Sequence, residues 1–105
     1  MSFTGREEHG ITLNEAAELT KDYRNQMAAN QILGGFFGKD AFRAILDQSN
    51  CVGIRYYYGL NSAGQQVLVL VGVTEDENDL YNGVLAELSV PCPNHCSSNN
   101  PLNSD

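Results

Sequence analysis

The sequence predicts an α+β fold in which two N-terminal helices are followed by a three-stranded antiparallel sheet. Three observations predict it. Apolar residues recur at the helical period before Asn50, and the period changes to two after it. Residues 61–64, Asn-Ser-Ala-Gly, have the length and composition of a hairpin turn between two apolar runs.

The first helix is predicted over residues 12–31. Thr12 and Glu15 have the spacing of a capping box, in which each side chain bonds a free amide of the other residue. A second, shorter helix is predicted over residues 39–48, with an apolar side that includes Ile45. Between the helices, the glycines of residues 34–38 are expected to cap the first helix and turn the chain.

Three strands are predicted over residues 51–60, 65–74 and about 84–90. The middle strand is apolar on both faces from Val67 to Val73, whereas a strand covered on one side alternates with polar residues. We therefore expect this strand to be central. The helices can cover one face of the sheet, and the C-terminal tail or a second copy of the chain must cover the other.

The chain has the length of one ordinary domain, with 105 residues. We predict a flexible N-terminus over residues 1–10, a single α+β domain over residues 11–90 and an irregular tail over residues 91–105. The tail prediction depends on its prolines, Pro91, Pro93 and Pro101, and on its many Asn and Ser residues.

The charge balance is acidic, with 13 Asp and Glu against 6 Lys and Arg and a net charge of -7. Binding to nucleic acid or to an anionic membrane surface requires clustered cations, so neither is expected. The acidity favours solubility and would suit a basic protein partner. The first residues contain no apolar block typical of a secretory signal, so the expected location is cytoplasmic.

One cluster has the residue types of a metal site. Cys92, His95 and Cys96 lie within five residues, and Cys51 would complete a tetrahedral zinc set if the fold brought it close. The alternatives are reduced thiols in a flexible tail, with Cys51 buried as a small apolar residue, or a disulfide between Cys92 and Cys96. No other cofactor is expected, and no set of catalytic residues is predicted.

Five segments together resemble a group of small bacterial proteins of the Bacteroidetes type that have no assigned function. They are Leu-Thr-Lys-Asp-Tyr-Arg-Asn-Gln (19–26), Phe-Phe-Gly-Lys-Asp (36–40), Cys-Val-Gly-Ile-Arg-Tyr (51–56), Leu-Val-Leu-Val-Gly-Val (68–73) and Pro-Cys-Pro-Asn-His-Cys (91–96). The resemblance covers residues 11–103. It implies a free-standing bacterial protein and transfers no site residue.

Two hypotheses of function follow from the sequence. The first is a non-catalytic protein-interaction module that self-associates as a homodimer through its sheet, because an exposed apolar strand without charge or proline would aggregate. The alternative is a small metal- or ligand-binding protein, or an enzyme, with its site near the Cys/His cluster. The zinc content of the purified protein distinguishes the two.

Overall fold

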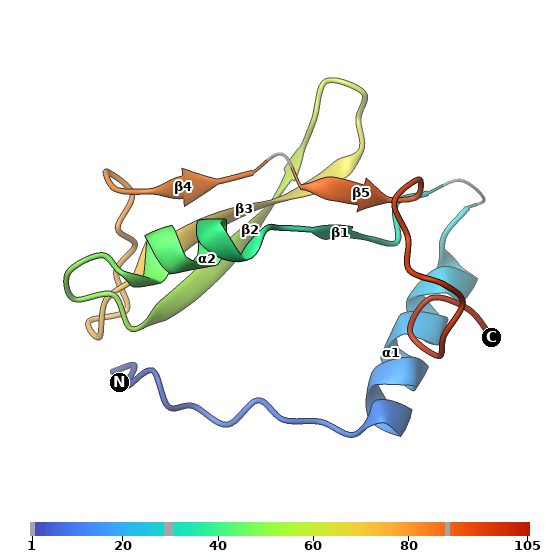
Figure 1. The fold of residues 1–105 in the computed structure, drawn as a ribbon, viewed down its shortest axis with the longest axis horizontal. Helices are drawn as coiled ribbons and strands as arrows, with labels where there is room; N and C mark the ends of the chain where they lie inside the picture. Colours follow the sequence, from blue (N-terminus) through green and yellow to red (C-terminus); the bar gives the residue numbers. More distant parts are fainter. Residues whose placement is uncertain (1, 29–30, 88) are drawn as a thin grey trace. The chain divides into compact units, whose positions relative to one another are not determined.

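The computed structural model describes residues 2–28, 31–87 and 89–105. The chain divides into two compact units, which we call unit 1 (residues up to Glu8, with Phe37–Ser89) and unit 2 (His9–Phe36 with Val90–Asp105). The predicted α+β class is confirmed. The elements, in chain order, are α1 Leu13–Gln26, β1 Gly34–Phe36, α2 Lys39–Leu46, β2 Gly53–Leu60, β3 Gln66–Val73, β4 Leu85–Ala86 and β5 Val90–Cys92 (Figure 1). The domain boundaries at residues 10 and 90 stay a prediction.

Unit 1 contains the predicted antiparallel sheet, with strand order β2-β3-β4. The central position of β3 is therefore confirmed. β2 and β3 pair without interruption from Gly53↔Val73 to Leu60↔Gln66. The turn forms where the sequence predicted it. Gly64 adopts a φ of +77°, a conformation that glycine reaches easily and residues with a side chain rarely adopt. The Asn61 side-chain oxygen also accepts the backbone N–H groups of Ala63 and Gln65, each at 2.9 Å.

The hydrophobic core of unit 1 is built around β3, with α2 against one face of the strand. Ile45 of α2 is fully buried, and the other buried apolar side chains among the described residues are Leu70, Val71 and Val73 of β3. α2 lies in front of β2 and β3 in Figure 1 and contacts both strands. Its N-terminus has no side-chain cap, since the N-cap residue is Gly38, so packing on the sheet supplies most of its stability.

Unit 2 contains α1, whose N-terminus is the predicted one. Thr12 Oγ1 accepts the Glu15 N–H at 3.1 Å, and the Glu15 carboxylate accepts the Thr12 N–H at 3.0 Å, so the capping box is confirmed. The helix ends at Gln26, before the predicted residue 31, because Met27 is extended. The Tyr23 hydroxyl donates to the Ile32 carbonyl at 3.2 Å, which holds the returning chain beside the last turn. Of the predicted last turn, Ala29 and Asn30 lie outside the described residues.

The glycine-rich segment between the helices is a strand and not the predicted helix cap. β1 pairs antiparallel with β5 in the register Gly34↔Cys92, Gly35↔Pro91 and Phe36↔Val90. This pairing also corrects the third strand predicted over residues 84–90. Its first part is the short β4, its end at Val90 belongs to β5, and Leu88 lies outside the described residues. Proline is accepted in β5 because a two-stranded ribbon leaves one edge of each strand outside the hydrogen-bonded ladder.

No helix in the described ranges is both long enough and apolar enough to cross a membrane.

Candidate functional site

The two faces of the β2–β3 hairpin differ in what covers them. Opposite residues of an antiparallel pair share a face, so Tyr56 lies beside Leu70 and Tyr57 beside Val69. A side-chain carbon added at Gly72 would lie 3.3 Å from Cγ2 of Ile45 and 2.9 Å from Sγ of Cys51. α2 therefore covers the Tyr56 face, at the end of the hairpin that contains Gly72.

The opposite end of the hairpin, which we call the hairpin end, comprises residues 56–60 and 66–69 with the loop between them. Within the described residues, β4 pairs only with Leu70 and Val71 of β3, so the hairpin end is two-stranded. Its largest side chains are exposed, at 55% for Tyr56, 49% for Tyr57, 69% for Tyr58 and 75% for Leu60. A two-stranded ribbon is marginally stable in water by itself, so a partner that covers the hairpin end would stabilise it.

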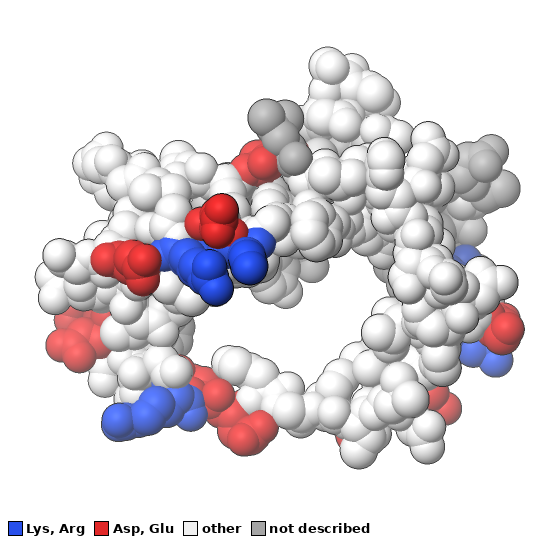
Figure 2. Space-filling model, viewed as in Figure 1, with Lys and Arg blue, Asp and Glu red and all other residues white. Residues whose placement is uncertain are grey.

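The hairpin end also differs from the rest of the chain in charge. Residues 56–74 contain no Asp, Glu, Lys or Arg in a chain whose net charge is -7. Figure 2 shows the β2–β3 loop, at the top of the view, as white throughout. Tyr56 and Tyr58 pack edge to face, with ring centroids 5.7 Å apart. The result is an apolar, aromatic surface of the composition that protein interfaces favour.

On the Tyr57 face, a polar cluster lies at the border of the hairpin end. Arg55, the single charge between residues 52 and 73, contacts an Asp79 carboxylate oxygen at 2.5 Å through Nη1. The other Asp79 oxygen accepts the Tyr57 hydroxyl at 2.5 Å. The Phe3 ring lies over the Arg55 guanidinium, 5.8 Å from the ring centroid to Cζ. This cluster joins the N-terminal segment and the loop after β3 to β2.

Proton equilibria in this cluster follow from its hydrogen bonds. The bond from Tyr57, followed by the bond and charge of Arg55, lowers the pKa of Asp79. The same bond to Asp79 raises the pKa of Tyr57. At neutral pH the carboxylate is therefore charged and the phenol neutral, with each stabilising the other. Arg55 and Asp79 therefore form a structural ion pair, to which the Tyr57 phenol adds a hydrogen bond.

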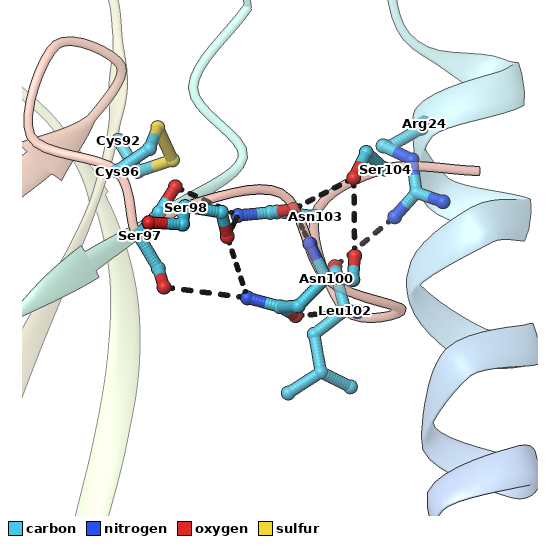
Figure 3. The surroundings of a disulfide bond; sticks show 9 residues. All are labelled: Arg24, Cys92, Cys96, Ser97, Ser98, Asn100, Leu102, Asn103 and Ser104. Carbon is cyan, nitrogen blue, oxygen red and sulfur yellow. Dashed lines mark hydrogen bonds between the residues drawn. A yellow bond between two sulfur atoms is a disulfide. The ribbon is translucent and has the colours of Figure 1, made fainter.

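Unit 2 contains the only disulfide in the part of the chain that the structure describes, between Cys92 and Cys96. Figure 3 shows it at the base of a tail whose Ser and Asn side chains bond mostly to backbone groups of the tail itself. Asn100, for example, accepts the Leu102 N–H at 2.8 Å and donates to the Ser98 carbonyl at 3.0 Å. Arg24 of α1 fixes this tail by donating to the Leu102 carbonyl at 3.0 Å and to Asp105 at 2.6 Å.

A shallow groove of about 500 Å³ lies between α1 and the tail. Lys21 and Arg24 line it from the helix, and Asn100 and Asp105 from the tail. The bond from Arg24, with the charges of Arg24 and Lys21, lowers the pKa of Asp105. The cations of the groove thus already hold a carboxylate of the chain itself.

The predicted zinc ligands have different environments. Cys92 and Cys96 are joined to one another, which is the disulfide alternative considered from the sequence, and His95 lies exposed in the same turn. Its backbone N–H donates to the Pro91 carbonyl at 3.0 Å. Cys51 belongs to unit 1, where its thiol donates to the Gly53 carbonyl at 3.2 Å. A zinc site of these four residues applies to the reduced form and stays a prediction.

Sequence reasoning missed the partner of Arg55. A lone charge within an apolar hairpin requires a counter-ion, and the acidic loop after β3 was one source of it, although Asp47 is nearer to Arg55 in the sequence. The need for a counter-ion therefore predicts an acidic partner for Arg55 but does not select Asp79 from the other acidic residues.

Comparisons with protein-family models, with curated proteins and with solved structures found no match to this chain. The bacterial resemblance of its five segments stays a prediction.

Proposed function

We propose that this protein is a non-catalytic interaction module that self-associates as a homodimer through the hairpin end of unit 1. The observation that carries the proposal is the exposure of Tyr56, Tyr58 and Leu60 on a segment without charge. Monomers rarely expose contiguous apolar patches of more than a few hundred Å². Covering these side chains therefore stabilises the protein.

The size of the surface supports a protein partner. At about 200 Å² for each large side chain, the exposed parts of Tyr56, Tyr58 and Leu60, which share one face of β2, amount to roughly 400 Å². A standard interface buries about 800 Å² on each partner. The hairpin end can thus supply the centre of an interface, and its backbone and loop can supply the rim.

Charge favours a second copy as that partner. Two copies with a net charge of -7 repel each other, and they approach at the lowest cost where neither carries charge. The basic protein partner suggested by the acidic composition would instead bind the Asp and Glu residues outside the hairpin end. Salt distinguishes the two, because screening weakens binding of a basic partner and strengthens association of two acidic copies.

A charge placed in the hairpin end tests the proposal. We expect the wild-type chain to be a dimer by light scattering at micromolar concentration and Leu60→Glu to be a monomer, since the substitution places two like charges at the interface. Leu19→Glu is the matched control, because Leu19 is similarly exposed at 64% but lies on α1. The proposal fails if the wild-type chain is a monomer, or if both variants associate as it does.

The second candidate function is metal binding at the Cys/His cluster, and one observation favours it. The structure brings Cys92 and Cys96 close enough to share a bond, with His95 in the same turn. After reduction by a dithiol, two thiolates and an imidazole would be available to zinc, with Cys51 as the proposed fourth ligand. Zinc should then bind stoichiometrically to the reduced protein and not to its oxidised form or to Cys96→Ser. Metal-free reduced protein in excess zinc would exclude this function.

A further inference from the structure

The disulfide of unit 2 joins two cysteines that are four positions apart in the sequence. A disulfide that closes a long loop restricts the unfolded chain strongly, whereas one that closes a short loop restricts it least. The Cys92–Cys96 bond therefore stabilises the fold less than a bond between distant segments would. Its effect is local, and it fixes the direction in which the chain leaves β5.

The two cysteines of this disulfide differ in how the rest of unit 2 holds them. Cys92 belongs to β5, and its carbonyl accepts the Leu33 N–H at 2.7 Å. The turn after β5 is closed by the hydrogen bond from the His95 N–H to the Pro91 carbonyl, at 3.0 Å. The sulfur bridge extends the constraint one residue further, to Cys96.

The chain after the disulfide, residues 97–105, is held to α1 by one side chain, and we call it the terminal segment. Arg24 donates to the Leu102 carbonyl at 3.0 Å (Figure 3) and to the Asp105 carboxylate at 2.6 Å. In the part of the chain that the structure describes, these are the hydrogen bonds between α1 and the terminal segment. The Leu102 side chain stays 46% exposed, so apolar burial adds little to the docking. A segment with so few contacts is easily released.

We propose that the Cys92–Cys96 disulfide is a redox latch for the terminal segment. In the oxidised chain, the disulfide directs the segment along α1, where Arg24 holds it. In the reduced chain, the segment leaves α1 and uncovers the Arg24 side chain, which is 15% exposed while the segment is docked. The inference is independent of the self-association proposed for unit 1, because every residue of the latch belongs to unit 2.

A dithiol reductant supplies the electrons that open the latch. One of its thiolates attacks Sγ of Cys96, because Cys96 is exposed whereas Cys92 is half-buried. The bond between the two protein sulfurs breaks, and its electron pair leaves with Sγ of Cys92, which takes up a proton. The second thiolate of the reductant then attacks the reductant sulfur of the mixed disulfide, and Cys96 leaves as a thiolate that is protonated in turn. The reductant ends as a disulfide and the protein as two thiols.

Hydrogen exchange in the oxidised and the dithiothreitol-reduced wild-type chain tests the latch. The Ser104 N–H donates to the Asn100 carbonyl at 3.0 Å within the terminal segment, and it should exchange faster after reduction. We expect an increase of about 10-fold, since closing a loop this short restricts the chain by at most about 30-fold. The Ala16 N–H, which donates to the Thr12 carbonyl in α1, should exchange at the same rate in both forms.

The pKa of Asp105 reports its contact with Arg24 directly. In the docked segment, the hydrogen bond from Arg24, together with the charges of Arg24 and Lys21, lowers this pKa. After reduction, the pKa should rise to about 3.9, the usual value for an exposed aspartate, in an NMR titration of the carboxyl carbon. Arg24→Gln should raise the pKa without reduction, and reduction of this variant should then leave the pKa unchanged.

Cysteine variants separate the latch from other effects of the reductant. Cys96→Ser cannot form the disulfide and should behave as the reduced chain does. Cys51→Ser is the matched control, because it removes the thiol of unit 1 and should respond to reduction as the wild type does. The wild-type measurements decide the proposal even if Cys96→Ser fails to fold.

Three results would refute the latch. The first is equal Ser104 exchange, or an equal Asp105 pKa, in the oxidised and the reduced chain. The second is equal acceleration of exchange at Ser104 and Ala16, because unit 2 would then loosen as a whole. The third is a disulfide that dithiothreitol leaves intact in the folded chain.

Discussion

Replacement of Ile45 by alanine tests the packing of α2 on the sheet. Because α2 packs at the end of the hairpin that contains Gly72, it leaves the hairpin end exposed. Ile45 is the one fully buried large side chain among the described residues, and its Cγ2 lies against Gly72 of β3. Few other side chains share this core. We expect Ile45→Ala to be among the most destabilising single substitutions in unit 1.

The magnitude follows from the atoms that are removed. Isoleucine to alanine deletes three carbons, worth about 2.4 kcal/mol at roughly 0.8 kcal/mol for each buried CH₂. Incomplete collapse of the resulting cavity adds to this, and measured losses for such substitutions are about 2–5 kcal/mol. We expect a loss of about 3 kcal/mol, which is a large part of the roughly 5–15 kcal/mol typical of a small domain.

Urea unfolding followed by circular dichroism measures this loss. The midpoint should fall while the slope with urea stays constant, because the surface exposed on unfolding hardly changes. Leu46→Ala is the matched control, since Leu46 is the next residue of α2 and is 47% exposed. It should cost under about 1 kcal/mol. Equal losses in the two variants would refute the packing of α2 described here.

Two further predictions concern the polar cluster and the disulfide. The pKa of Asp79 is lowered in the folded state, so the stabilisation of the fold by the charged Asp79 is present above about pH 4 and is lost as pH falls through the lowered pKa. Asp79→Asn should therefore reduce the fall of the melting temperature at acid pH. An unchanged fall in this variant would contradict the prediction. Reduction of Cys92–Cys96 opens a short loop worth about 2 kcal/mol. The Leu33 amide, which donates to the Cys92 carbonyl at 2.7 Å, should then exchange faster while Leu80 exchange is unchanged; equal rates in oxidised and reduced protein at Leu33 would contradict it.

Local signals in the sequence were sufficient for the N-terminus of α1 and for the hairpin. The capping box of Thr12 and Glu15 and the turn before Gln65 each depend on residues a few positions apart, so their interactions could be read directly from spacing. The uncharged apolar run of β3 likewise predicted a central strand, because burial on both faces removes the need for alternation.

Long-range pairings could not be predicted in the same way. Glycines at 34 and 35 carry no strand propensity, and they form β1 because β5, far along the chain, supplies the partner. The same applies to the ion pair between Arg55 and Asp79, which joins a strand to a distant loop. For the candidate site, the sequence identified the uncharged strands but not that β2 would be an edge strand with its tyrosines exposed.

The dependence of molecular mass on concentration tests the proposed self-association most directly. Sedimentation equilibrium of the oxidised wild-type chain, from about 1 to 100 µM, should show the mass rising from the 11.5 kDa of one chain toward twice that value. The rise should begin at lower concentration when salt is increased, because the repulsion between two acidic copies is screened. A mass that stays at 11.5 kDa over the whole range and at both salt concentrations would contradict the account.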